Sequence, residues 1–330
     1  MEKQLFGSVA GKVWRSVGRL HSRMKFFLSG LLTVIFLAAP SPGVYGQAVP
    51  GDYQEVLSYL GRKGDFSGNV LKVGIPRNDV QVSIAGISVP TSFGFAGWIA
   101  MTKGEDGNDV MMGDLVLLQD EVNPVMSALL DNGLDATALH NHFFWDEPRM
   151  FYMHVHGYGK AMDLARRAKP ALDLIGHVAA IPPANAISVP MAGTIDTDKI
   201  AAIAGHKGEQ AGPVYKISLG RDDLAVKEHG AIINARMGLN SWAAFYGANE
   251  NAIIAGDIAM LEGEVTPVLH ALRKNKLDVV AIHHHMTGAR PTIIFLHYWG
   301  KGQAEKLAAG FKAALDELGK PGAAAHEMGQ

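Results

Sequence analysis

The chain has 330 residues, 48% hydrophobic and 19% charged, so it can bury the core of two domains or of one duplicated domain. Its 30 Lys and Arg nearly balance 32 Asp and Glu, and a formal net charge of -2 gives no general attraction to nucleic acid or to an anionic membrane. Cysteine is absent, which excludes disulfides, thiolate metal ligands and cysteine nucleophiles.

The N-terminal segment has the pattern of a signal peptide. Basic residues at positions 15, 19, 23 and 25 precede an apolar run at 26–39, and Pro and Gly residues then lead to a cleavage site near Gly46. The run is shorter than the about 20 residues that cross a bilayer. We therefore expect cleavage without a retained membrane anchor, and a periplasmic or secreted protein. Met24 is an alternative start, because the conventional signal layout begins there.

The predicted elements that follow alternate between strands and helices. Residues 70–75 and 80–84 are rich in β-branched residues and predict strands, as do the apolar segments at 114–119, 134–142 and 150–156. Residues 121–130 and 160–174 have helical spacing, and the first of these helices is expected to end at Asn132 and Gly133. The order β-α-β-β-α predicts an α+β fold in which helices cover one side of a sheet.

The same order returns in the second half of the chain. With a constant shift of 143, 15 of the 30 residues at 113–142 are identical to those at 256–285. Upstream, a shift of 144 pairs further residues, including Lys72 with Lys216 and Trp98 with Trp242. An internal duplication is therefore expected. The predicted organisation is a signal peptide (1–46), a first repeat (47–178), a proline-containing connection (179–197), a second repeat (198–320) and a disordered tail (321–330).

Each repeat carries three histidines at the same spacing. They are His140, His142 and His154 in the first repeat, and His283, His285 and His297 in the second. Residues two apart in a strand leave the same face, and a third histidine on the next strand converges with them in a suitable register. Three imidazoles with an open coordination position form a typical catalytic zinc site, and imidazole also binds copper, nickel or iron. The alternative is a set of histidines that only make hydrogen bonds.

Glu147 lies between the two predicted histidine strands of the first repeat. It is a candidate general base or fourth metal ligand, whereas its counterpart, Arg290, is suited only to orient an anion. This difference favours the first repeat as the catalytic one, unless both residues are simply exposed in a hairpin loop. His156 and His284 each occur in one repeat only and are weaker candidates.

Other repeated charges are expected to be structural. Glu121 and Glu264 begin predicted helices, where an acidic side chain complements the helix dipole. The charged residues of two further pairs lie two positions apart at predicted strand ends, where we expect ion pairing: Arg77 with Asp79, and Arg221 with Asp223.

The residues around the histidines resemble those of a known family. Ala-Leu-His-Asn-His at 138–142 and Phe-Tyr-Met-His at 151–154 are echoed by Ala-Ile-His-His-His-Met at 281–286 and Phe-Leu-His-Tyr-Trp-Gly at 295–300. This pattern resembles the LppY/LpqO family of exported, duplicated bacterial domains, a resemblance that implies location and no particular activity. The lipobox cysteine of its mycobacterial lipoproteins is absent here.

The histidine spacing alone is also similar to the zinc triad of acetolactate decarboxylase. The Gly-Gly that precedes the third histidine in that enzyme is replaced here by Tyr152-Met153. We therefore expect an exported metalloprotein that acts as a zinc-dependent hydrolase or lyase on a small carbonyl substrate. The alternatives are a non-enzymatic periplasmic protein that binds a metal ion or another ligand, and a structural interaction module.

Overall fold

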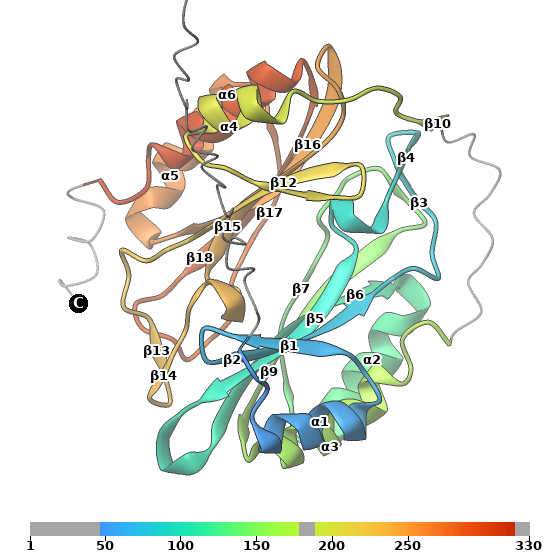
Figure 1. Cartoon of the computed structure of the whole chain (residues 1–330), viewed down its shortest axis with the longest axis vertical. Coiled ribbons are helices and arrows are strands. Elements are labelled where there is room, and N and C mark those ends of the chain that lie inside the picture. Colours follow the sequence, from blue (N-terminus) through green and yellow to red (C-terminus); the bar gives the residue numbers. More distant parts are fainter. Residues whose placement is uncertain (1–46, 178–188, 321–330) are drawn as a thin grey trace, which may run out of the picture. The chain divides into compact units, whose positions relative to one another are not determined.

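Two six-stranded antiparallel sheets with the same strand order form the framework of the computed structural model (Figure 1). In spatial order, the first sheet consists of β1 (Gly64–Ser67), β2 (Val70–Pro76), β5 (Ala96–Lys103), β6 (Asp109–Leu118), β9 (Met150–Gly159) and β7 (Asp135–His140). The second consists of β11 (Glu209–Ala211), β12 (Val214–Gly220), β15 (Asn240–Ala248), β16 (Asn251–Met260), β18 (Ile294–Gly302) and β17 (Asp278–His283). The predicted α+β fold and internal duplication are confirmed.

The structure describes residues 47–177 and 189–320. The predicted signal peptide, much of the predicted connection and the predicted tail lie outside these residues. None of the helices in the described part of the chain is long and apolar enough to cross a membrane.

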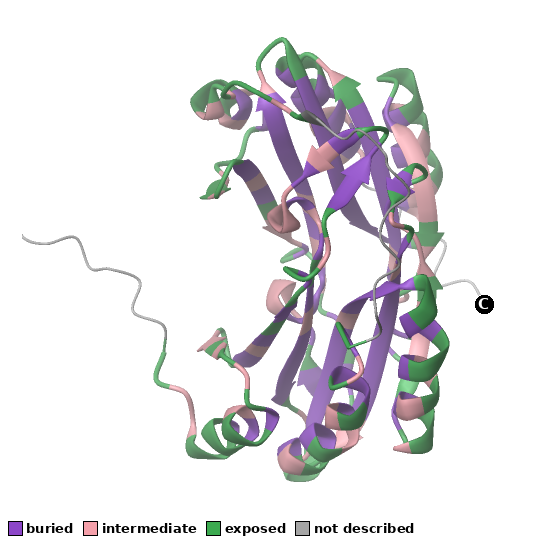
Figure 2. Cartoon of the chain, turned by 90° about the vertical axis from the view of Figure 1, so that its right-hand side faces the viewer, coloured by how far each residue is buried: buried purple, intermediate pink, exposed green. Residues whose placement is uncertain are grey.

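Three helices cover one side of each sheet. They are α1 (Gly51–Leu60), α2 (Gln119–Asp131) and α3 (Ala161–Leu172) in the first repeat, and α4 (Thr197–Ala204), α5 (Glu262–Lys274) and α6 (Ala304–Leu315) in the second. Strand alternation divides each sheet into two faces. On β9, Met153 and Val155 enter the core under the helices, whereas His154 between them points to the opposite face. Most strand residues are therefore buried on both faces (Figure 2).

On the faces turned away from the helices, each repeat extends a segment, here called its arm, onto the sheet of the other repeat. The arm of the first repeat is made of β3 (Val82–Ile84) and β4 (Ile87–Val89), which form a small sheet with β8 (Asp146–Glu147) and β10 (Val189–Pro190). Its apolar residues share a core with the second sheet. The arm of the second repeat is made of β13 (Lys227–Glu228), β14 (Ala231–Ile232) and the 3-10 helix η3 (Ala235–Met237), and shares a core with the first sheet. Each repeat thus completes the core of the other.

The sequence missed several elements. The predicted strand at 80–84 is shorter, and the one at 134–142 ends at His140. Helix α1 and strands β1, β4 and β5 were not predicted. Most positions of β5 are buried or half-buried, so it lacks the clear alternation of apolar and polar residues that marks a half-exposed strand.

Gly256 on β16 is required by close packing. A Cβ atom there would overlap the carbonyl oxygen of Trp242 and the hydroxyl of Tyr298. We expect Gly256→Ala to lower the free energy of unfolding by about 1–3 kcal/mol, the usual cost of overpacking. Gly302→Ala is the matched control, because a Cβ there meets nothing within 4 Å, and it is expected to be nearly neutral. Urea unfolding of both variants checks this, and equal midpoints would contradict it.

Candidate metal centre

The six repeated histidines lie in one cluster between the two sheets. His140 and His283 end the edge strands β7 and β17, and their rings stack with centroids 3.8 Å apart. The Thr137 hydroxyl of β7 also donates a hydrogen bond, at 2.7 Å, to the carbonyl of His285, two residues beyond the end of β17. The cluster therefore belongs to both repeats.

Among histidine-to-histidine contacts, the shortest ones of the other four histidines also cross between repeats. His142 stacks on His297 at 3.6 Å between centroids, and His154 lies 3.9 Å from His285. Two groups of three have candidate ligand nitrogens that all lie within 4.8 Å of one another. They are His140, His283 and His297, and His154, His283 and His285. Each of these groups mixes histidines of both repeats.

The local backbone differs from the geometry expected from the sequence. His142 lies two residues beyond the end of β7 and not within the strand. A bulge at Ala136–Ala138 places Ala138 opposite His154, and His140 opposite Tyr152. His142 consequently stacks on the Tyr152 ring, with centroids 3.3 Å apart.

Backbone carbonyls set the tautomer of the third histidine in each repeat. Nδ1 of His154 lies 3.3 Å from the carbonyl oxygen of Gly113, and Nδ1 of His297 lies 3.3 Å from that of Gly256. A carbonyl oxygen only accepts, so each Nδ1 carries the proton and each Nε2 keeps a free lone pair. Ligating histidines in metalloproteins are commonly oriented by such a hydrogen bond.

The remaining imidazole nitrogens lack ordinary partners. Among the described residues, no hydrogen bond reaches either ring nitrogen of His140, His142 or His283, or Nε2 of His154, His285 or His297. Buried polar atoms are normally satisfied, and leaving one unpaired costs about 1–3 kcal/mol. A cluster of unpaired imidazole nitrogens is the arrangement that a transition-metal ion would satisfy.

Burial keeps these histidines neutral. It lowers the pKa of His154 to about 3, although the hydrogen bond to Gly113 acts in the opposite direction. Burial and then the neighbouring imidazoles lower the pKa values of His142 and His285 well below the usual value. Neutral imidazole is the form that binds a metal ion.

We expect the metal-free protein to lose stability as pH falls below about 6.5. A histidine whose pKa is lower in the folded than in the unfolded state stabilises the fold fully above the unfolded value, and this contribution disappears in acid. The raised pKa values of the buried Asp114 and Asp257 act in the opposite direction, but the histidines outnumber them. Urea midpoints of chelator-treated protein between pH 7.5 and 5.5 measure the slope. His154→Ala should flatten it, and an unchanged slope would contradict this assignment.

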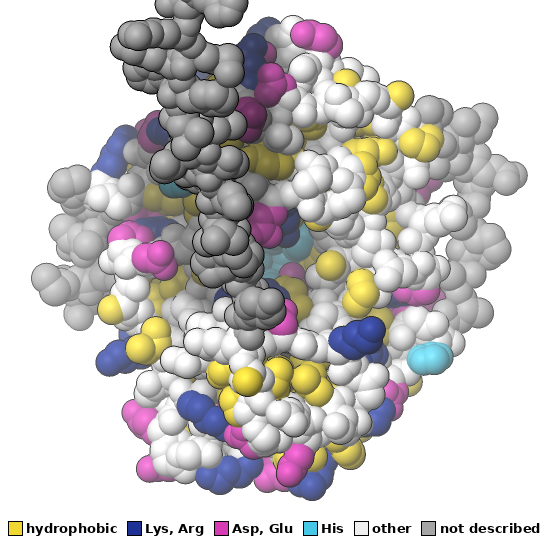
Figure 3. Space-filling view, viewed as in Figure 1, with side chains coloured by type: hydrophobic (Ala, Val, Ile, Leu, Met, Phe, Trp, Pro, Cys, Tyr) yellow, Lys and Arg dark blue, Asp and Glu magenta, His cyan; other side chains and the backbone are white. Residues whose placement is uncertain are grey.

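A cavity of about 600 Å³ opens beside the histidines. Histidine side chains are visible in the hollow near the middle of the face in Figure 3. The cavity is lined by equivalent residues of both repeats, namely Lys72 and Lys216, Gly94 and Gly238, Trp98 and Trp242, Asp114 and Asp257, and His142 and His285. It therefore lies where the two repeats face each other.

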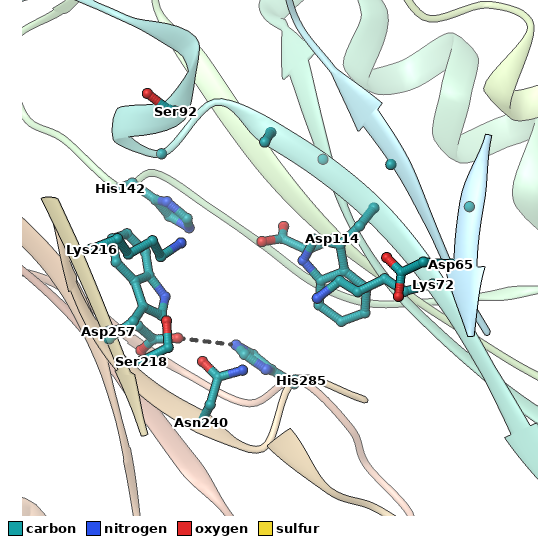
Figure 4. A pocket seen from close by; sticks show the side chains of 18 of the residues that line it. Asp65, Lys72, Ser92, Asp114, His142, Lys216, Ser218, Asn240, Asp257 and His285 are labelled. Carbon is teal, nitrogen blue, oxygen red and sulfur yellow. Dashed lines mark ion pairs between the residues drawn. The ribbon is translucent and has the colours of Figure 1, made fainter. Parts of the chain in front are cut away.

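Three aspartates line this cavity, namely Asp65, Asp114 and Asp257 (Figure 4). Asp114 is the neighbour of His154 across β6 and β9, and Asp257 is the neighbour of His297 across β16 and β18. Asp257 also lies 3.6 Å from Nε2 of His285. Burial raises the pKa of Asp114 to about 7 and that of Asp257 well above its usual value. The candidate site thus combines imidazoles with carboxylates.

The other predicted candidates lie elsewhere. Glu147 is exposed on β8, where it is the strand partner of Ser83, and it does not line the cavity. Its catalytic role stays a prediction, which this position does not favour. Arg290 and His284 are exposed. His156 is nearly buried and lies 3.1 Å from Glu228 of the other repeat.

The paired lysines, tryptophans and aspartates of the cavity were not predicted from the sequence as functional residues. All of them recur in both repeats, so the duplication contained the signal. Only the arrangement of the two repeats brings them together.

Comparisons with known proteins identify a family and no activity. A family described as "Domain of Unknown Function (DUF1259)" matches residues 54–174 and again 198–317. No curated protein matches the sequence.

Solved structures that match include microcompartment shell proteins. The double-ringed trimeric shell protein MSM0271 of the RMM microcompartment is 12% identical, covers 64% of this chain and 81% of its own, and has a TM-score of 0.16. EtuB from Clostridium kluyveri is 10% identical, covers 76% of this chain and 89% of its own, and has a TM-score of 0.18.

Proposed function

The chain belongs to the family described as Domain of Unknown Function (DUF1259), whose domain it carries twice, and from its site we propose that it is a metal-dependent enzyme. The two repeats together hold a transition-metal ion, zinc in the first instance, through histidines of both. The reaction is either hydrolysis or a lyase-type cleavage of a small carbonyl substrate in the adjoining cavity. The unpaired nitrogens of the buried histidine cluster carry this proposal.

The chemistry follows from the donor set. Three neutral imidazoles leave an open position on zinc, and an ion so held polarises a carbonyl group or lowers the pKa of water. Asp114 and Asp257 face the same cavity and are placed to accept or return a proton. Copper, nickel and iron also suit an imidazole site.

The proposal also covers where the protein acts and which known proteins its histidine motifs are similar to. We propose that the protein acts in the periplasm or outside the cell, after removal of its predicted signal peptide. The likeness of its histidine motifs to LppY/LpqO proteins and to the zinc triad of acetolactate decarboxylase supports an exported zinc protein.

Metal analysis of the purified protein tests the metal centre. His283 belongs to both three-histidine groups, so His283→Ala should lower the bound metal most, whereas the exposed neighbour His284 offers the matched control His284→Ala. After dialysis against zinc, we expect at least one ion per wild-type chain, the same in His284→Ala, and much less in His283→Ala. Wild-type protein without metal, or His283→Ala with a full complement, would overturn the proposal.

A non-enzymatic metal carrier is the second candidate. It is favoured by the number of histidines, because six exceed the three that one catalytic ion needs. Turnover separates the two. The enzyme should hydrolyse or decarboxylate members of a panel of small esters and 2-hydroxy or 2-oxo acids, and chelation or Asp114→Asn should abolish this activity. A fully loaded protein that is inert to the whole panel would favour the carrier.

A further inference from the structure

Two lysines, one from each repeat, face the cavity beside the histidine cluster. Lys72 lies on β2 and Lys216 occupies the equivalent position on β12 (Figure 4). Each ammonium group lies over a tryptophan ring, 4.1 Å from the centroid of Trp98 for Lys72 and 4.2 Å from that of Trp242 for Lys216. The cavity therefore contains two positive charges, one from each repeat.

Neither charge has a close counter-ion. Within residues 47–177 and 189–320, no carboxylate oxygen lies within 4.0 Å of either ammonium group. Asp114 and Asp65 act on Lys72 only at longer range, and Asp65, the cross-strand neighbour of Lys72, forms its ion pair with Arg236. Asp257 and Asp114 likewise act on Lys216 only at longer range. Burial, followed by the charge of Lys216, lowers the pKa of Lys72 to about 8, as expected when two amines share a desolvated space. A divalent ion on the histidines would add to the positive charge.

The walls of the cavity leave room for an organic molecule. Trp98 of the first repeat approaches Gly238 of the second, where a Cβ would lie 3.1 Å from the indole ring. Gly238 also has a φ of 98°, so both space and backbone conformation favour glycine there. A cavity of about 600 Å³ falls within the range that holds small organic ligands and exceeds what one inorganic anion fills.

We propose that the cavity binds a small organic anion whose carboxylate or phosphate group lies between Lys72 and Lys216. The tryptophans flank the rest of the molecule, which points toward the histidines. The proposal names the substrate class of the metal-dependent reaction, and rests on the proposed function for that role. The binding of the anion itself depends only on the lysines and the cavity.

Calorimetric titration of the zinc-loaded protein tests this. The probes are succinate, inorganic phosphate and the uncharged succinamide, at constant ionic strength. We expect succinate to bind and succinamide not to bind. Because a hydrogen bond to a charged group is worth about 1.5–3 kcal/mol, Lys72→Met and Lys216→Met should each weaken the affinity by roughly ten- to a hundredfold. Lys72→Arg, which keeps the charge, should recover part of the loss.

Lys306→Met, on the exposed face of α6, is the control and should bind as wild type does. Binding of phosphate as well as succinate would assign a general anion site, and succinate alone a carboxylate site. The absence of binding by both anions, or wild-type affinity in folded Lys72→Met and Lys216→Met, would overturn the proposal. Zinc content is measured in the same samples. Lysine-dependent anion binding without zinc would overturn the metal proposal alone, and zinc without anion binding would overturn this one alone.

Discussion

Replacing His154 with alanine is expected to weaken zinc binding by about a hundredfold or more, because the substitution removes a ligand that lies beside the histidines of the other repeat. His154 contributes one nitrogen to the group that also contains His283 and His285. Structural zinc sites with four ligands bind with about 10–16 kcal/mol, so one ligand accounts for about 3 kcal/mol. That energy corresponds to a factor of about one hundred.

The partner of His154 can be identified by a double-mutant cycle. His154→Ala and His285→Ala should each cause a large loss, and the double variant should lose little more, because both remove the same site. His142 lies in neither three-histidine group, so His142→Ala should add its own effect to that of His154→Ala independently. Competition with a chromophoric chelator measures the affinities. Coupling of His154 to His142 in place of His285 would restore the within-repeat triad expected from the sequence.

Replacing Glu121 with glutamine is expected to destabilise the fold by about 3 kcal/mol or more. Glu121 is fully buried and accepts hydrogen bonds from Arg77 at 2.5 Å and from the backbone N–H groups of Leu118 and Gly176, each at 2.7 Å. Removing one member of a buried ion pair leaves a charge that is only partly compensated, which typically costs 3–5 kcal/mol. Urea unfolding monitored by circular dichroism measures the loss.

Asp79→Asn provides the control for Glu121→Gln. Asp79 contacts the same arginine at 2.8 Å, which confirms the predicted pair, but its side chain is 40% exposed. Exposed ion pairs contribute about 0–1 kcal/mol, so this variant should be close to wild type. Glu264 repeats the arrangement with Arg221, and Glu264→Gln should cost as much as Glu121→Gln. A loss for Glu121→Gln as small as that for Asp79→Asn would contradict the assigned role.

The sequence predicted the duplication because the same residues recur at a constant shift, and the layered fold because its elements depend on local pattern. The apolar run of β9 and the helical spacing in α2 are properties of short segments. The sequence indicated that Glu121 begins a helix. It did not indicate the contact with Arg77, because 44 positions separate the two residues. Pairing at that distance depends on sheet order, which spacing along the chain does not determine.

The histidine cluster shows the same limit more clearly. The spacing of His140, His142 and His154 indicates which side chains can share a face, but not which surface that face meets. A bulge in β7 and the early end of the strand changed the local geometry, and the facing repeat supplied the nearest histidines. Lys72 and Lys216 were visible as repeated residues, although nothing in the sequence placed them in one cavity.

The exchanged arms and the mixed histidine groups have a consequence for a chain with a single repeat. A chain with only one repeat would leave its arm without a sheet to cover and its histidines without their nearest partners. Two copies related by a twofold axis through the cavity would supply both. A chain with one such repeat would therefore need a second copy, as in a homodimer, to complete its core and its histidine groups. The two halves of the present chain are not identical at this interface: His156 pairs with Glu228 on one side, whereas the equivalent positions carry the apolar Trp299 and Ile84 on the other.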